Sequence, residues 1–192
     1  MSATAPVIRN AVRLWLEKLE AGDLVCVAVS GGADSLALAY VLSLEAPKLA
    51  IQLHAVTVDH QLQSTSAAQA ATVVVQMKSL GIETTVVKVS VEITEGLEAS
   101  ARKARYAALD SVGDTLNAVA IFLGHTRDDQ AESVLLGLAR GSGARSLSGM
   151  AVVNGKIVRP LLSVTREVTE QACKDLGLDA WSDPHNFNAE FS

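Results

Sequence analysis

Short apolar runs alternate with longer stretches of helical periodicity along most of this chain. Four runs have the length and content of buried strands: residues 24–29, 51–58, 84–89 and 118–123. Helical patterns lie between them, and amphipathic helices are also expected over residues 7–20 and 165–176. This alternation is typical of successive βαβ units. It predicts an α/β fold in which helices cover both faces of a parallel twisted sheet.

The composition fits one domain of ordinary size. Hydrophobic residues make up 49% of the 192 positions, enough to bury a sizeable core. No apolar run reaches about 18 residues and no charged segment precedes a short apolar one, so we expect a cytoplasmic protein without a membrane span or signal peptide. Cys26 and Cys173 are not part of a C-x-x-C pair, and we interpret both as small buried hydrophobes.

Charge is distributed unevenly along the chain. The formal net charge of −5 argues against nonspecific nucleic-acid binding by the whole surface. Residues 102–166, however, hold nine basic and five acidic side chains, so this stretch carries +4 and the remainder −9. A local positive region suits a phosphate-rich ligand or a nucleic acid held at one place. An ordinary solvated face explains the charge pattern about as well.

A glycine-rich loop follows the first apolar run directly. Gly31 and Gly32 lack a Cβ atom, so the backbone there can take positive φ and direct its N–H groups toward one point. A helix expected to begin near Asp34 adds free N–H groups and the positive end of its dipole, and serines add hydroxyl donors. The loop therefore predicts a phosphate site made of Ser30, Gly31, Gly32, Ala33, Asp34 and Ser35.

Two features refine this phosphate site. The lysine of the G-x-x-x-x-G-K-[ST] loop is missing, which argues against the β/γ-phosphate chemistry of that loop. An acid, Asp34, is present instead, and we interpret it as a ligand of a magnesium ion that accompanies the nucleotide. The structural alternative is a Gly-rich strand-to-helix turn capped by Asp or Ser.

Polar residues also follow the second expected strand. Ligands of open α/β sheets bind beyond the carboxyl ends of the strands, so these residues belong to the same predicted site. Val58 and Asp59 are expected to form a wall for the base or ribose, chiefly through backbone groups. His60 alone is better explained as a polar loop residue.

The fourth apolar run leads into Gly124 and His125, and then into a helix start that contains Asp129 and Glu132. These two acids are three residues apart and share one helical face. They could bind a cationic substrate, hold a metal ion or take a proton from an attacking amine. Acids in a first turn are also favoured by the helix dipole, so helix-end chemistry is the alternative explanation.

Taken together, these motifs resemble the catalytic domain of the tRNA(Ile)-lysidine synthase family. The resemblance runs in order over residues 24–186, and it implies a single PP-loop ATP-pyrophosphatase domain with an adenine nucleotide α-hydrolase-like, Rossmann-like fold. Members of the family have also been labelled cell-cycle proteins. The segments that carry the resemblance are residues 30–35, 58–60, 98–109, 124–132, 140–143, 159–162 and 183–186.

The resemblance implies a two-step reaction. ATP first adenylates the C2 oxygen of the wobble cytidine of tRNA(Ile) with anticodon CAU, releasing pyrophosphate, and free L-lysine then displaces AMP to leave lysidine. Residues 30–35 would hold the departing pyrophosphate, and Mg²⁺ on Asp34 would spread the developing charge. By the same resemblance, Arg105 contacts the activated nucleotide, and Asp129 with Glu132 binds lysine. Further nucleotide contacts are expected from Val58, Asp59, Gly124 and His125.

Two departures from the family pattern limit what is carried over. Gln63 stands where the family commonly has an arginine, so no role is transferred to it. The chain stops at Ser192, within a segment that in the family continues toward C-terminal tRNA-binding domains, and we expect it to be truncated there. Arg140 could approach tRNA or phosphates, and a cation at a helix C-terminus explains it nearly as well.

Three other functions use the same kind of loop. A sulfur-inserting tRNA enzyme would need cysteine pairs, for which Cys26 and Cys173 are poor candidates. A glutamine-dependent amidating ligase would need a second domain that produces ammonia. A nucleotide-binding sensor without turnover would need the loop but neither Asp129 nor Glu132. The oligomeric state is not predicted.

Overall fold

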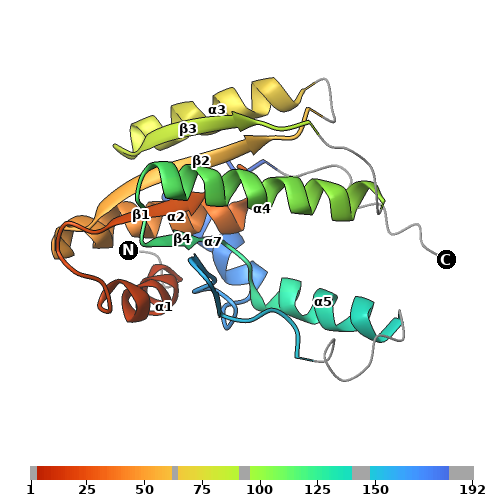
Figure 1. Ribbon diagram of the computed structural model, residues 1–192. Helices are drawn as coiled ribbons and strands as arrows, with labels where there is room; N and C mark the ends of the chain where they lie inside the picture. The colour runs from red at the N-terminus through yellow and green to blue at the C-terminus, as the bar shows by residue number, and fades with distance from the viewer. Residues whose placement is uncertain (1–3, 62–64, 91–95, 140–147, 182–192) are drawn as a thin grey trace.

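A computed structural model describes residues 4–61, 65–90, 96–139 and 148–181. A six-stranded sheet forms its centre, with the order β3-β2-β1-β4-β6-β5 (Figure 1). Every neighbouring pair is parallel except β5 with β6. The four predicted strands are confirmed. The strands are β1 (Leu24–Ala28), β2 (Gln52–Asp59), β3 (Glu83–Lys88), β4 (Ala120–Phe122), β5 (Val153–Asn154) and β6 (Ile157–Val158).

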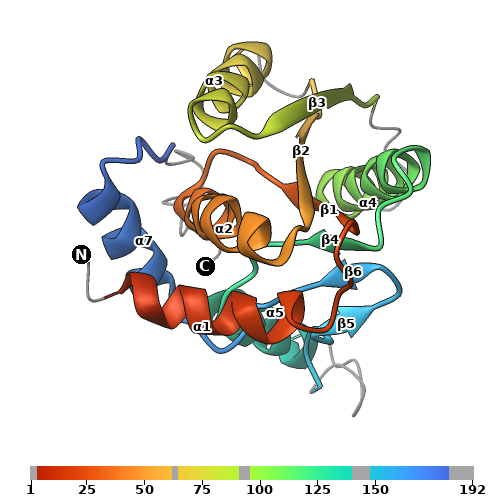
Figure 2. The ribbon, with the colours of Figure 1, turned by 90° about the vertical axis from the view of Figure 1, so that its left-hand side faces the viewer.

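Helices cover both faces of the sheet, as predicted. Helices α1, α2, α3 and α7 lie on one face and α4 on the other (Figure 2). Figure 1 shows α5 on the side toward which the arrowheads of β2 and β3 point. None of the helices in the described segments is long and apolar enough to cross a membrane. The helices are α1 (Ala5–Leu16), α2 (Ala33–Glu45), α3 (Ser66–Ser79), α4 (Leu97–Thr115), α5 (Arg127–Ala139) and α7 (Arg166–Leu176), with a 3₁₀ helix over Ala46–Leu49.

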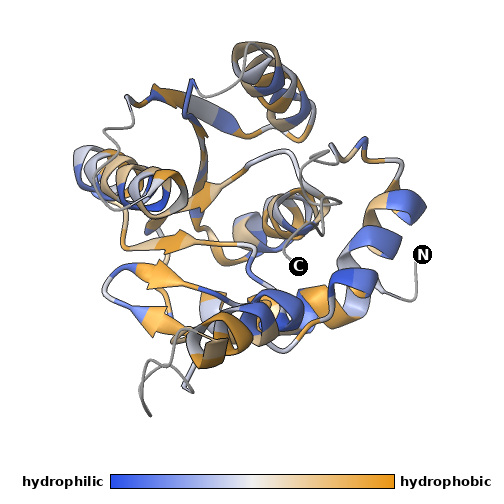
Figure 3. Ribbon diagram, turned by 90° about the vertical axis from the view of Figure 1, so that its right-hand side faces the viewer, coloured by the Kyte–Doolittle hydropathy of each residue, from blue (hydrophilic) through white to orange (hydrophobic). Residues whose placement is uncertain are grey.

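The central strands are buried on both faces, which explains their continuous apolar sequence. Successive side chains of a strand point to opposite faces. Val25 and Val27 therefore join the core under α1, α2, α3 and α7, while Cys26 packs with Leu109 and Ile121 under α4. Figure 3 shows the central strands mostly in the orange of hydrophobic residues.

The antiparallel hairpin of β5 and β6 was not predicted, so the sheet is not wholly parallel. Each of these strands has only two residues, too short for a periodic pattern. Asn154 pairs with Ile157, so the loop is Gly155-Lys156, and its glycine was the available signal, because Gly at the first loop position favours a two-residue type II′ turn. Gly155 has φ of +58° there, as this kind of turn requires.

The strand order places a binding crevice between β1 and β4. Strand β1 pairs with β2 on one side and with β4 on the other. The order of the strands reverses at this point, and ligands of open α/β sheets bind in the crevice beyond the carboxyl ends there. Residues 30–35 follow β1, and residues 124–126 follow β4.

Candidate functional site

A cavity of about 1230 Å³ lies at this crevice. Its walls come from the loop after β1, the end of β2, helix α4, the start of α5, helix α7 and residues 178–181. The volume is generous for one small ligand, since typical pockets for such ligands measure roughly 300–1,000 Å³. The cavity brings together every predicted site residue except Gly31: Ser30, Gly32, Ala33, Asp34, Ser35, Val58, Asp59, Arg105, Gly124, His125, Asp129 and Glu132.

The loop after β1 takes its shape from one glycine and one serine. Gly31 has φ of +92°, as predicted, and its carbonyl accepts the N–H of Trp181 at 2.9 Å. The prediction of positive φ is wrong for Gly32, which has φ of −72° because it is the extended N-cap residue of α2. The Ser35 hydroxyl donates to the Gly32 carbonyl at 2.9 Å and accepts the Ser30 N–H at 3.2 Å, so it braces the loop from inside.

Gly124 has a packing role at the end of β4. A Cβ atom at this position would lie 3.0 Å from backbone atoms of Asp34 and Ser35. The strand end and the first turn of α2 can therefore approach only because residue 124 has no side chain. This contact fixes the start of α2, and with it the loop, against the end of β4.

Three carboxylates meet one guanidinium on one side of the cavity. The Nη2 atom of Arg166 lies 2.8 Å from Asp129 Oδ1, and its Nη1 atom lies 3.3 Å from Glu132 Oε1. Its Nε atom is 3.8 Å from Asp34 Oδ2. Asp34 also accepts a hydrogen bond from the Thr169 hydroxyl. We call Asp34, Asp129, Glu132 and Arg166 the acidic wall.

Asp34 is suited to hold a cation at neutral pH. Burial raises the pKa of its carboxyl to about 6, against the lowering effect of the Thr169 hydrogen bond, so the group is mostly ionised at pH 7. Magnesium typically uses one or two protein carboxylates together with phosphate and water ligands. Within the described segments no three His, Cys, Asp or Glu side chains are grouped as a metal site. One carboxylate beside a phosphate loop therefore fits magnesium that arrives with a nucleotide.

Both explanations of the acid pair apply to Asp129. Its Oδ2 atom accepts the backbone N–H of Thr126 at 2.6 Å and the Thr126 hydroxyl at 2.9 Å, which caps the start of α5. Its Oδ1 atom is left for Arg166 and faces the cavity. The Glu132 side chain is 60% exposed. Asp129 is thus fixed in position, and Glu132 is the freer of the two acids.

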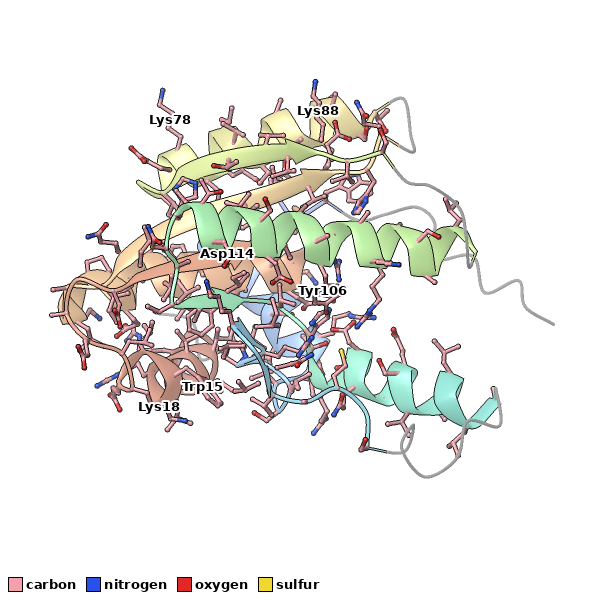
Figure 4. The ribbon with its side chains drawn as sticks, viewed as in Figure 1. Trp15, Lys18, Lys78, Lys88, Tyr106 and Asp114 are labelled. Carbon is pink, nitrogen blue, oxygen red and sulfur yellow. The ribbon has the colours of Figure 1, made fainter. Side chains whose placement is uncertain are left out.

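A second group of side chains, which we call the basic wall, lines the cavity near α4: Arg105, His60, His125 and, behind them, Arg159. The buried Arg159 donates from Nε to His125 Nδ1 at 3.2 Å and from Nη2 to the Tyr106 hydroxyl at 3.0 Å. Tyr106 belongs to α4 (Figure 4). Burial, with Arg105 and Arg159 nearby, lowers the pKa of His125 to about 4. His125 is therefore neutral at pH 7, with its proton on Nε2.

Two atoms of the basic wall are buried without a hydrogen-bond partner among the described residues: Arg105 Nε and His60 Nδ1. Burial lowers the pKa of both side chains. Buried polar atoms are nearly always paired in folded proteins, so such exceptions point to a missing ligand. An anion with acceptor atoms would supply a partner for Arg105.

Asp59 has a local partner of its own. Its carboxylate accepts the N–H of Gln61 at 2.9 Å, and hydrogen bonds from Ser66 and Gln61 lower its pKa. The side chain thus orders the turn between β2 and α3. Val58 and Asp59 both line the cavity, and a nucleotide contact through their backbone groups stays a prediction.

Sequence reasoning missed Arg166, Thr169 and Arg159 as site residues. Arg166 was counted only as a charge, Arg159 as a charge and as part of the segment 159–162 that carries the resemblance, and Thr169 was given no role. Arg166 pairs with Glu132, Thr169 with Asp34 and Arg159 with His125, each 34 or more residues away on another element, so no local spacing could reveal these contacts. Gln63, Arg140 and the segments 140–143 and 183–186 lie outside the described residues.

Both cysteines are buried, as predicted. Burial raises the pKa of Cys26 and of Cys173 to about 11, so both are protonated thiols at neutral pH. Cys173 borders the cavity, but its thiol donates to the Ala33 carbonyl at 3.3 Å. Thiolates are the reactive and metal-binding form of cysteine, so neither residue is suited to sulfur transfer.

Comparisons with known proteins agree with this geometry. The family model of the PP-loop domain matches residues 6–192. The tRNA(Ile)-lysidine synthase of Thermobifida fusca (strain YX) is 50% identical over 187 residues, covering 97% of this chain and 58% of that protein. The tRNA(Ile)-lysidine synthase of Streptomyces coelicolor is 51% identical over 178 residues, covering 91% of this chain and 51% of that protein. The chain thus spans little more than half the length of these relatives.

A solved structure has a similar fold. It is the U34-tRNA thiolase NcsA from Methanococcus maripaludis with its [4Fe-4S] cluster. The TM-score is 0.79 at 22% sequence identity, over 94% of this chain and 67% of that one. This likeness confirms the predicted adenine nucleotide α-hydrolase-like fold.

Proposed function

Since this chain belongs to the PP-loop domain family, we propose that it catalyses the ATP-dependent ligation of L-lysine to C2 of the wobble cytidine in tRNA(Ile) with anticodon CAU. The products are lysidine, AMP and pyrophosphate. The observation that carries the proposal is the meeting of a phosphate loop and an acid pair in one cavity. The names of the relatives, at about half identity over nearly the whole chain, support tRNA(Ile) and lysidine, and the family resemblance implies free lysine and the CAU anticodon.

In the first step the C2 oxygen of cytidine attacks the α-phosphorus of ATP, and pyrophosphate leaves. The loop of residues 30–35 and the first turn of α2 offer backbone N–H groups to the departing phosphates. Asp34 would hold the magnesium ion, which neutralises developing negative charge on the phosphates. Arg105, whose Nε has no described protein partner, would contact the activated nucleotide. The neutral His125 can donate one hydrogen bond from Nε2 without adding charge.

In the second step the ε-ammonium of lysine loses a proton to become an amine, the amine attacks C2, AMP leaves and the nitrogen loses a second proton. Lysine arrives as an ammonium cation, so two carboxylates in the cavity suit its binding. Asp129 is held by its cap at the start of α5 and would orient the amine. Glu132 is more exposed and would adjust to it. Either acid can accept the proton once the amine is bound.

The structure weighs against the rival functions. Sulfur transfer needs reactive thiols, and both cysteines of the chain are buried and protonated. A nucleotide sensor would have no use for Asp129 and Glu132 in the cavity. A substitution in the acid pair should therefore leave a sensor unchanged and impair a ligase.

The test measures two products with the same protein. Pyrophosphate release from ATP is followed with the CAU-anticodon isoleucine tRNA, with methionine tRNA of the same anticodon and without tRNA, and labelled lysine incorporation is then measured. The full-length Thermobifida fusca relative serves as the positive control, because it exceeds this chain in length. We expect release that depends on isoleucine tRNA. Release independent of tRNA, or nucleotide binding without release, would point to another ligase or to a sensor.

A further inference from the structure

The place of Arg166 among the three acids suggests how the two substrates are ordered. We propose that Arg166 is a resident cation that pairs with Asp129 and Glu132 and is drawn to the polyphosphate when nucleotide binds, so that nucleotide binding promotes lysine binding. The inference rests on the proposed function, since it assigns a regulatory role within the same site. Four observations support it.

First, Arg166 uses the atoms that a substrate ammonium needs. Asp129 Oδ2 is committed to the cap of α5, so Oδ1 is its remaining acceptor, and Arg166 Nη2 lies 2.8 Å from it. Arg166 Nη1 lies 3.3 Å from Glu132 Oε1. A lysine ammonium placed between the same oxygens would meet the guanidinium. The two cations therefore compete for Asp129 and Glu132.

Second, the backbone of Arg166 is held in place while its side chain is partly exposed. The backbone N–H of Arg166 donates to Asp128 Oδ2 at 2.8 Å, which pins the first residue of α7 to α5. The guanidinium end is different, because the side chain is 39% exposed. A long side chain on a fixed pivot can swing between neighbouring acceptors without unfolding its helix.

Third, the phosphate loop lies within reach of that swing. Arg166 Nε is 3.8 Å from Asp34 Oδ2, and Asp34 is part of the loop itself. A nucleotide polyphosphate with its magnesium ion still carries net negative charge. The planar fork of arginine is well matched to phosphate oxygens. A bound nucleotide thus offers Arg166 a better partner beside its present one.

Fourth, the basic wall needs no such exchange. Arg105 Nε and His60 Nδ1 are already without described partners, so an anion can bind there without breaking an ion pair. A cation that binds to the acidic wall must first replace Arg166. The charge pairing within the cavity therefore favours the anionic nucleotide as the first ligand.

Calorimetric titration of L-lysine, with and without magnesium and a non-hydrolysable ATP analogue, tests the inference. In the wild type we expect the analogue to lower the Kd for lysine by roughly three- to tenfold, the range of a partly exposed ion pair that must be displaced. Because coupling is reciprocal, lysine should tighten analogue binding by the same factor. In Arg166→Gln, lysine should bind the nucleotide-free protein as tightly as it binds the wild type with analogue, and the analogue should no longer change its Kd.

Two further variants make the test specific. Arg13→Gln removes an exposed arginine that pairs with Glu17 on α1, outside the cavity, and should keep the wild-type coupling. Arg166→Lys keeps a cation that reaches fewer carboxylates at once, so its coupling should be intermediate. This variant also carries the test if Arg166→Gln fails to fold, because wild-type coupling in Arg166→Lys would contradict the proposal.

The outcomes separate the inference from the proposed function. Lysine binding that weakens in Arg166→Gln in both states would mean that Arg166 only holds the acids in place, and the inference would be wrong. Unchanged coupling in Arg166→Gln would overturn it as well. The function itself would fail if lysine bound neither protein in either state while the analogue still bound. Both would be supported if lysine bound tightly to the wild type only with the analogue present, and bound tightly to Arg166→Gln with or without it.

Discussion

The two walls of the cavity differ in how their charges are satisfied. On the acidic wall, Asp34, Asp129 and Glu132 share the guanidinium of Arg166, so charges are neutralised within the protein. On the basic wall, Arg105 keeps a buried Nε atom without a described partner. An anion can therefore bind to the basic wall directly, whereas a cation must first displace Arg166 from Asp129 and Glu132. That asymmetry suits an enzyme whose nucleotide must react before its amine.

The two walls also differ in what builds them. Asp34 and Asp129 stand in the first turns of α2 and α5, and Arg166 is the first residue of α7. Helix N-termini carry partial positive charge, which favours ionised acids. The basic wall instead depends on the buried Arg159, which holds His125 and Tyr106. The acidic wall is thus set by local helix starts and the basic wall by tertiary hydrogen bonds.

The largest effect is expected from Asp34→Ala, which removes the acid nearest the phosphate loop. In the proposed mechanism the magnesium ion would lose its protein ligand without this carboxylate, and pyrophosphate release should fall at least about 100-fold. Quenched time courses of pyrophosphate release at saturating tRNA would measure the loss of rate. Asp114→Ala is a suitable control, because Asp114 does not line the cavity and pairs with Lys156 at the C-terminal end of α4 (Figure 4). Release near the wild-type rate in Asp34→Ala would remove the metal role from this residue.

Arg105→Gln should weaken the basic wall without weakening the fold. Loss of a charge-assisted contact to the nucleotide should raise the Kd of a non-hydrolysable ATP analogue by roughly 10- to 100-fold. Arg105 Nε has no described partner to lose and the guanidinium gives up only its contacts with Tyr106, so the thermal midpoint should fall little. Calorimetry and thermal unfolding of the same sample would check both results. A large loss of stability with unchanged analogue binding would make Arg105 a structural residue instead.

Glu132→Ala should separate the two chemical steps. Glu132 lies on the acidic wall but 60% exposed, so its loss should lower lysine transfer by about 10-fold and spare adenylation. Single-turnover measurements of pyrophosphate release and of labelled lysine incorporation would compare the steps. Glu17→Ala, which breaks an exposed ion pair on α1, controls for lost surface charge. Equal loss of both steps would contradict the division of roles between the walls.

The sequence predicted the fold well because its strands are buried on both faces. Continuous apolar runs such as residues 24–29 leave few alternatives to a central parallel strand, whereas the two-residue strands β5 and β6 carry no such pattern. The loop was predictable because glycine and serine act through the local backbone. The same reasoning failed for Gly32, whose N-cap conformation depends on where α2 begins.

The site was predictable only in part, because its charges are coupled across distant elements. Asp129 and Glu132 were identified from their spacing on one helix. Arg166, which pairs with both acids, comes from another helix 34 or more residues further along the chain. Its position as the first residue of α7 does not indicate that it lies beside Asp129 and Glu132. Contacts of this kind depend on how α7 packs beside α2, and periodicity does not encode that packing.

The smallest predicted effect concerns the free energy of unfolding, which the burial of the Asp34 carboxylate lowers at neutral pH. Burial raises the pKa of Asp34 from its usual value of 3.8 to about 6 in the folded protein. The folded state therefore binds the proton more tightly than the unfolded state does. The contribution of the neutral carboxyl is fully present below pH 4 and is lost as the pH rises through about 6. At pH 7 the ionised carboxylate makes the fold less stable than a neutral side chain would.

Asp34→Asn should consequently raise stability while it abolishes pyrophosphate release. An amide keeps an acceptor for the Thr169 hydroxyl but has no charge to desolvate, so we expect a gain of about 1–2 kcal/mol at pH 7, or a few degrees in Tm. The gain should vanish at pH 4, where Asp34 is protonated in the folded state. Thermal unfolding of both proteins at the two pH values would measure it. A variant that is less stable at pH 7 would mean that the ion pair with Arg166 outweighs burial, and that the acidic wall holds the fold together as well as the substrate.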